Sequence, residues 1–184
     1  MQDLEIKSTN IQGCYILEPV ICRDARGVFM ETFHKKKLET LLGGPLEFVQ
    51  DNQSVSNRNV LRGLHFQKGE HAQAKLGRVV RGRALDVVVD LREKSKSFRE
   101  VFTIELSEYN NLQLFIPRGL AHGFLALEDQ TVFSYKCDAY YYPGSESGII
   151  YNDPELAIDW GIPDSELIIS EKDRRLQYLK ELFP

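Results

Sequence analysis

Residues 76–90 read LGRVVRGRALDVVVD, two runs of apolar residues separated by Arg81-Gly82-Arg83. A glycine between charged residues favours a tight turn, so this spacing predicts one strand over 76–81 and the next over 84–90. The run from Asp86 to Asp90 shows little alternation of apolar and polar residues, which predicts a strand buried on both faces. This stretch therefore indicates a β-rich fold.

The same pattern of short apolar runs and turn residues continues on both sides of this stretch. It predicts further strands over residues 47–53, 60–66, 101–106, 113–116 and 131–142. From Phe102 to Leu106 apolar and polar residues alternate, which suits a strand with one buried face. Many strands at such close spacing predict an all-β sandwich or barrel.

Two short helices are predicted to flank the strands. Residues 34–42 carry charge on one side and leucines on the other, and Gly43-Gly44 is a stop signal. The second helix is expected to begin near Ser170, because Ser170 and Asp173 have the spacing of a capping box, and to continue through Leu179.

The composition is that of an ordinary globular protein, with 42% hydrophobic and 27% charged residues, and 184 residues fit a single domain over 1–184. The net charge of −4 disfavours broad nucleic-acid binding, which needs a basic face. The longest apolar runs are too short to cross a bilayer, and the start of the chain does not resemble a leader. We therefore expect no membrane insertion, a cytoplasmic location and three reduced cysteines.

The first candidate for chemistry is His65, within Arg62-Gly63-Leu64-His65-Phe66-Gln67. In an extended strand Arg62 faces one way with Leu64 and Phe66, and His65 faces the other way with Gly63 and Gln67. A histidine between glycine and glutamine does not look like a core residue. The pattern alone favours neither an incidental histidine on a polar face nor a catalytic one.

A second histidine, His122, follows the Pro117-x-Gly119 turn and stands between small residues. Taken alone, it is best explained as a hydrogen-bonded turn residue. Two of four histidines in β-rich, glycine-flanked positions nevertheless suggest a shared pocket. Tyr135, with Tyr140 and Tyr141 beyond it, could bring phenols to the same pocket, although most tyrosines of such a fold belong to its core.

The residues that follow His65 bear on the choice between a metal site and acid-base chemistry. His65 is followed two places later by Gln67 and not by a second histidine, and the next carboxylate, Glu70, stands in a predicted turn. A metal site needs three or four ligands in suitable geometry. The sequence therefore favours acid-base chemistry by histidine itself over a metal site.

Several long motifs, in this order and spacing, resemble the dTDP-4-dehydrorhamnose 3,5-epimerase family. The resemblance extends through Tyr135-Lys136, Glu146 and Lys172-Asp173, so it covers nearly the whole chain. The motifs are Asp24-Ala25-Arg26-Gly27, Phe48-Val49-Gln50-Asp51-Asn52, Val60-Leu61-Arg62-Gly63-Leu64-His65-Phe66-Gln67, Ala72-Gln73-Ala74-Lys75-Leu76 and Ile116-Pro117-x-Gly119-x-Ala121-His122-Gly123-Phe124.

The resemblance implies an all-β, cupin-type jelly roll with a few short helices, acting as a homodimer without a cofactor. It implies conversion of dTDP-4-keto-6-deoxy-D-glucose into dTDP-4-keto-L-rhamnose by proton transfer at C3 and C5. It assigns His65 as the base, Asp173 as its partner, Lys75 as the oxyanion stabiliser and Tyr135 as the acid. Asp173 could also be a simple helix cap and Lys75 a solvated strand lysine.

The resemblance also implies the residues that bind the substrate. It directs four charged residues toward the diphosphate or its surroundings, two amides toward thymidine, one ring to stack on the base, and two residues to the neighbourhood of the sugar. Two of the charged residues, Arg26 and Glu31, would come from the neighbouring subunit. The residues directed toward the diphosphate are Arg26, Glu31, Arg62 and Lys172, and those directed toward thymidine are Gln50 and Asn52. Tyr141 is the stacking ring, and Glu146 and His122 are the residues near the sugar.

Two departures from the family pattern are mild. Gly77-Arg78 stands where an apolar residue is commoner, and the run Tyr140-Tyr141-Tyr142 leaves the stacking ring ambiguous by one position. Three other functions are compatible with the residues: a single-carbon epimerase of a related dTDP-4-keto-6-deoxy sugar, a non-catalytic cupin that binds carbohydrate, and a metal-dependent cupin oxygenase.

Overall fold

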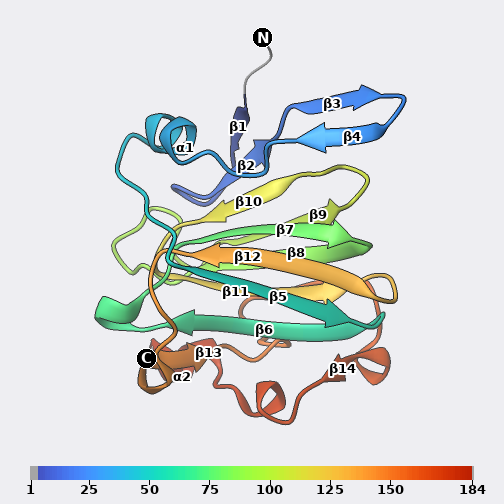
Figure 1. The fold of residues 1–184 in the computed structure, drawn as a ribbon. Helices are drawn as coiled ribbons and strands as arrows, with labels where there is room; N and C mark the ends of the chain where they lie inside the picture. The colour runs from blue at the N-terminus through green and yellow to red at the C-terminus, as the bar shows by residue number, and fades with distance from the viewer. Residues whose placement is uncertain (1–3, 184) are drawn as a thin grey trace.

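The computed structural model describes residues 4–183, and its core consists of two mainly antiparallel sheets that pack face to face (Figure 1). The first sheet has the order β1 (Glu5–Ser8), β2 (Tyr15–Glu18), β10 (Gln113–Ile116), β7 (Lys75–Arg81), β12 (Thr131–Cys137) and β5 (Gln50–Ser56). The second has the order β13 (Glu146–Gly148), β6 (Val60–Gln67), β11 (Leu120–Ala126), β8 (Arg83–Asp90) and β9 (Val101–Ser107), with β14 (Ile168–Ile169) parallel to β6. The expected all-β jelly roll is confirmed.

Strand β8 lies at the centre of the packing because both of its faces are buried. Val88 packs between the two sheets, whereas Val87 and Val89 pack on the outer face of the second sheet. The prediction of a strand buried on both faces is therefore confirmed. Strand β9 alternates exposed Thr103 and Glu105 with more buried neighbours, as its sequence predicted.

The C-terminal segment covers the outer face of the second sheet and takes the place of a third layer. Trp160 and Leu179 are buried there with Leu64 of β6, and the Trp160 ring nitrogen donates a hydrogen bond to the Tyr151 carbonyl at 2.9 Å. The segment also contains the short helical turns η2 (Pro143–Ser145) and η3 (Asp164–Glu166).

The continuous helix predicted from Ser170 is wrong. The chain forms one turn, η4 (Asp173–Arg175), becomes extended at Leu176, and re-forms a helix only in α2 (Leu179–Leu182). In the extended stretch Gln177 forms a parallel bridge with Ile149. Only half of the expected capping box forms: the Asp173 amide donates to the Ser170 hydroxyl at 3.1 Å, but the Asp173 carboxylate bonds to His65 and Gly63, and η4 begins at Asp173. Tertiary packing ends the helix after one turn.

The N-terminal part contains strands that the sequence reading missed, namely β1, β2 and the hairpin of β3 (Ile21–Asp24) and β4 (Gly27–Met30). This hairpin projects from one corner of the molecule (Figure 1), with Phe29 72% exposed. The predicted first helix is confirmed as α1 (Lys35–Leu42), which ends at Gly43 in the left-handed conformation.

Three strands in the middle of the chain also differ from prediction. Strand β5 starts three residues later than the predicted segment 47–53, and β12 ends at Cys137 although the prediction extended to 142. For the residues of strand β11, the sequence predicted only a turn followed by a histidine and no strand. Each of these segments contributes to the site described below.

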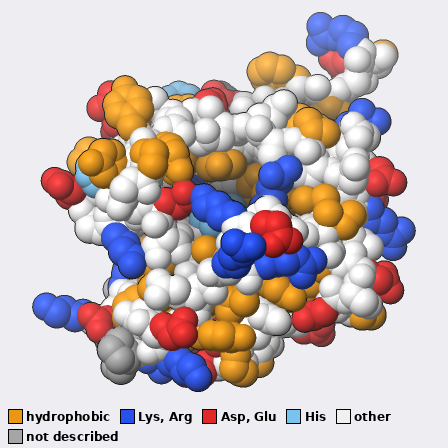
Figure 2. Space-filling view, turned by 90° about the horizontal axis from the view of Figure 1, so that it is seen from below, with side chains coloured by type: hydrophobic (Ala, Val, Ile, Leu, Met, Phe, Trp, Pro, Cys, Tyr) orange, Lys and Arg blue, Asp and Glu red, His pale blue; other side chains and the backbone are white. Residues whose placement is uncertain are grey.

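Lysine, arginine and acidic side chains are mixed over the face seen in Figure 2. Among the residues that the structure describes, no helix is long and apolar enough to span a bilayer.

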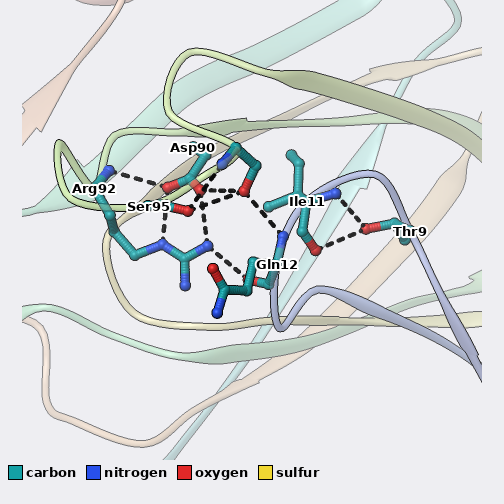
Figure 3. Close-up of polar contacts among 7 residues, drawn as sticks. Thr9, Ile11, Gln12, Asp90, Arg92 and Ser95 are labelled. Atoms are coloured by element: carbon teal, nitrogen blue, oxygen red, sulfur yellow. Dashed lines mark hydrogen bonds and ion pairs between the residues drawn. The ribbon is translucent and has the colours of Figure 1, made fainter.

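A buried carboxylate, Asp90, ties the N-terminal segment to the turn after β8 (Figure 3). It accepts hydrogen bonds from Arg92 Nε at 2.8 Å and from the Ser97 hydroxyl at 2.7 Å. Arg92 in turn donates to the Gln12 carbonyl at 2.6 Å. Burial alone would raise the pKa of Asp90, but these hydrogen bonds outweigh it and lower the pKa from 3.8 to about 2.

Candidate active site

A cavity of about 730 Å³ opens at one end of the sandwich between the two sheets. In the view of Figure 2, charged side chains surround a hollow near the middle of the face. All predicted site residues except Arg26 and Glu31 line this cavity: Gln50, Asn52, Arg62, His65, Lys75, His122, Tyr135, Tyr141, Glu146, Lys172 and Asp173. They come from both sheets and from the loops that follow β12 and β14.

A bulge at Gly63 determines which side chains of β6 reach the cavity. Gly63 has φ +121°, and a Cβ there would lie 2.6 Å from the Cα of Gly123 on β11, so only glycine fits. The β6–β11 register shifts at this point. Strict alternation along β6 predicts that Arg62 and His65 point to opposite faces of the sheet. That prediction is wrong, because the bulge lets both side chains line the cavity.

His65 is paired with Asp173 across the edge of the second sheet. His65 Nε2 lies 2.7 Å from Asp173 Oδ1, and Asp173 Oδ2 accepts the Gly63 amide at 3.2 Å. Burial alone would raise the pKa of Asp173, but the hydrogen bonds from His65 and Gly63 outweigh burial and hold the pKa below its ordinary value. An ionised carboxylate therefore fixes the orientation of the imidazole.

Lys75 and Tyr135 stand on the other wall, on the neighbouring strands β7 and β12 of the first sheet. The Lys75 ammonium lies 5.8 Å from the centre of the Tyr135 ring. Burial lowers the pKa of Lys75, and Cys137, Asp86 and Glu146 offset this only in part. Burial also raises the pKa of the Tyr135 phenol, so it stays protonated at neutral pH.

His122 lies directly opposite His65 in the β6–β11 ladder, so the expected shared pocket is confirmed. Its Nε2 lies 2.5 Å from Oδ1 of Asp86 on β8. Asp86 is fully buried, and its other oxygen has no partner among residues 4–183. Sequence reasoning gave Asp86 no role, although a carboxylate inside an otherwise apolar, doubly buried strand was a usable signal.

A second charged group lies at the rim of the cavity. Glu146 Oε2 accepts from Lys172 Nζ at 2.6 Å and from the Tyr141 hydroxyl at 2.7 Å. Burial alone would raise the pKa of Glu146, but these two hydrogen bonds lower it below the ordinary value. Among the three consecutive tyrosines, Tyr141 is the one that lines the cavity.

Amide side chains cover the part of the cavity next to Tyr141. Gln50 Nε2 donates to Asn52 Oδ1 at 3.0 Å, and Gln50 Oε1 accepts the Tyr141 amide at 2.8 Å. Gln67 and Gln73 line the same part and hydrogen-bond to the loop after β12. Both stand in motifs quoted above, but the sequence assigned them no role.

Arg26 and Glu31 are outside the cavity of their own chain. Arg26, at the tip of the β3–β4 hairpin, is paired with Asp24 at 2.5 Å, and its side chain is 90% exposed. Glu31 is paired with Lys37 at 2.8 Å and lines a separate small cavity of about 280 Å³.

The arrangement suits proton transfer on a ketone. A histidine oriented by a carboxylate stands on one wall, and an ammonium and a protonated phenol stand on the other. Within residues 4–183 there is no cluster of three or more histidine, cysteine or acidic side chains arranged to hold a metal ion.

Known proteins have a similar sequence and the same fold. The model of the family described as dTDP-4-dehydrorhamnose 3,5-epimerase matches residues 8–181. The enzyme of that name from Escherichia coli K12 is 50% identical over 179 residues, covering 97% of this chain and 96% of the relative. The crystal structure of the one from Elizabethkingia anophelis superposes with a TM-score of 0.95 at 48% identity, covering 98% of both chains.

A third relative was solved with a ligand. The structure of a dTDP-6-deoxy-D-glucose-3,5-epimerase from Legionella pneumophila, in complex with dTDP-4-keto-L-rhamnose, has a TM-score of 0.92 at 44% identity and covers 96% of this chain and 93% of that one. The match spans nearly all of the chain and includes the strands and loops that line the cavity. This protein belongs to the dTDP-4-dehydrorhamnose 3,5-epimerase family.

Proposed function

We propose that this protein is an isomerase that converts dTDP-4-keto-6-deoxy-D-glucose into dTDP-4-keto-L-rhamnose by inverting C3 and C5. The observation that carries the proposal is the His65–Asp173 pair, which faces Lys75 and Tyr135 across one cavity. The hydrogens at C3 and C5 both flank the C4 ketone, so removing either one gives an enolate that one set of groups can stabilise.

His65 is the proposed base. Its Nε2 bonds to the ionised Asp173, so the proton of the neutral imidazole resides on Nε2 and Nδ1 is left to accept the substrate proton. Nδ1 has no hydrogen-bond partner among residues 4–183. The negative charge of Asp173 then stabilises the imidazolium that forms.

Lys75 and Tyr135 complete the proposed reaction from the opposite wall. The ammonium of Lys75 would lie against the C4 oxygen and stabilise the enolate, an interaction that strengthens as charge develops. Because Tyr135 keeps its proton, it can return one to the ring from the face opposite His65. Removal on one face and return on the other inverts the carbon.

The nucleotide is proposed to lie along the rim. Arg62 and Lys172 carry the positive charge for the diphosphate, since guanidinium and ammonium groups suit phosphate oxygens. Tyr141 offers its ring to the base, and Gln50 and Asn52 lie beside it. His122 and Glu146 would border the sugar.

We also propose a homodimer in which Arg26 and Glu31 reach the partner's cavity. Their distance from their own cavity and the exposed Phe29 on the same hairpin support this arrangement. Mixing inactive Arg26→Ala and His65→Asn variants tests it, because one intact site can form in a mixed dimer. Recovery of activity is expected, and no recovery after subunit exchange would contradict it.

Residues 1–184 are proposed to act as one domain in the cytoplasm. The three cysteines, which are all unpaired, support a reducing compartment.

Product analysis tests the proposed reaction. The keto sugar formed from dTDP-4-keto-6-deoxy-D-glucose is reduced with borohydride, and the released sugars are identified. Inversion at both carbons gives L-rhamnose and 6-deoxy-L-talose. Sugars inverted at one carbon would identify a single-carbon epimerase, and unchanged D-sugars would contradict an epimerase acting on this substrate.

A further inference from the structure

The Gln67 side chain is a buried amide whose hydrogen-bonding groups are all occupied. Gln67 is 6% exposed. Its Nε2 donates to the carbonyls of His71 at 2.7 Å and Tyr140 at 3.2 Å, and its Oε1 accepts the Tyr142 amide at 2.6 Å. Exchanging the amide oxygen and nitrogen would set an acceptor against two carbonyls, so these partners fix the orientation of the group.

The partners of Gln67 belong to two irregular segments, which it joins to β6. One is η1 (Gly69–His71), and the other is the loop that follows β12. The His71 and Tyr142 rings also stack, with centroids 4.1 Å apart. Gln67 therefore holds the main chain on both sides of Tyr141, at residues 140 and 142.

Tyr141 has few other constraints on its position. The residue is 49% exposed, its amide donates to Gln50 Oε1 at 2.8 Å, and its hydroxyl donates to Glu146 at 2.7 Å. The bond to Glu146 fixes only the hydroxyl end of the ring, so the main chain, which lies on a loop outside any strand, determines where the other end lies. The hydrogen bonds of Gln67 to residues 140 and 142 hold this main chain in place before any ligand arrives.

We propose that Gln67 is a positioning residue for nucleotide binding, which presets the Tyr141 ring to stack on the base of the nucleoside diphosphate. This inference rests on the proposed function, because it assigns the Tyr141 wall to the nucleotide. Presetting an aromatic ring increases affinity by removing the entropy cost of ordering it on binding. The base His65 and the positioning residue Gln67 then stand two residues apart on β6.

A double-mutant cycle with dTDP as the probe tests the inference, measured by isothermal titration calorimetry. Gln67→Leu is expected to raise the Kd for dTDP roughly tenfold in the presence of Tyr141, and less than about twofold in a Tyr141→Ala background. The KM for the sugar nucleotide should rise by a larger factor than kcat falls. Gln12→Leu, an exposed glutamine remote from the cavity, is the matched control.

Gln67→Glu provides a second variant should Gln67→Leu fold poorly. Its carboxylate can still accept from Tyr142 but would face two carbonyls, so the Kd should again rise. An unchanged Kd in a folded Gln67 variant, or an equal rise in both Tyr141 backgrounds, overturns the inference alone. A wild-type protein that does not bind dTDP overturns the proposed function together with the inference.

Discussion

Asp173→Asn removes the charge beside His65 while keeping the shape of the side chain. The carboxylate lies 2.7 Å from His65 Nε2 and also accepts the Gly63 amide at 3.2 Å. An asparagine oxygen can still accept from one of these groups, so the fold should survive. The imidazolium formed when His65 takes a proton from the substrate, however, loses its counter-charge.

The size of the effect follows from that one interaction. A hydrogen bond to a charged group contributes about 1.5–3 kcal/mol. Because about 1.4 kcal/mol corresponds to a factor of ten in rate, kcat should fall about 10–150-fold. The KM should change less, since the charge develops on His65 only during proton transfer.

Initial rates of product formation at saturating substrate measure this loss. Ser170→Ala is the control, because it removes the hydrogen bond from the Asp173 amide and leaves the carboxylate in place. It should lower kcat less than Asp173→Asn does, because a neutral hydrogen bond contributes only about 0.5–1.5 kcal/mol. Full activity in Asp173→Asn, or an equal loss in both variants, would refute the role given to the carboxylate.

Three further changes probe separate groups. Tyr135→Phe should stop product formation yet retain exchange of the substrate hydrogens with solvent, and equal loss of both in an NMR time course would contradict its role as the acid. Asp86→Asn removes a charge that raises the pKa of Lys75, so the alkaline limb of the pH–rate profile should move to lower pH; an unmoved limb would contradict an essential protonated Lys75. The pKa of Asp90 falls from 3.8 to about 2 in the folded protein, so the ionised carboxylate stabilises the fold above pH 3.8. This stabilisation is lost as pH falls toward 2. Asp90→Asn should therefore cost about 2 kcal/mol in urea unfolding at pH 7, and an unchanged midpoint would show that the network contributes nothing.

Local patterns predicted the parts of the fold in which one physical constraint dominates. The three consecutive valines of β8 could only be buried on both faces, and the amphipathic segment before Gly43 could only be a helix. The N-terminal strands were missed because β3 and β4 are mostly exposed, so no buried face imposes an alternating pattern. The helix after Ser170 was overpredicted because a cap records where a helix starts and not how far it extends.

The site residues were likewise predicted where a local pattern was enough, and missed where distant parts of the chain meet. The composition of the Arg62 to Gln67 segment pointed to His65, but alternation could not foresee that the bulge at Gly63 turns both Arg62 and His65 toward one cavity. The pairing of His65 with Asp173 joins residues 108 positions apart, and only the family resemblance anticipated it. Asp86 was missed because its partner, His122, lies on another strand.

The most direct test of the account is proton NMR of dTDP-4-keto-6-deoxy-D-glucose in D2O with the wild-type protein and with His65→Asn. The wild type should remove the signals of the hydrogens at both C3 and C5, and in the folded variant both signals should persist at least about 100-fold longer. Exchange at the wild-type rate in the variant, or no exchange with the wild type, would contradict His65 as the base.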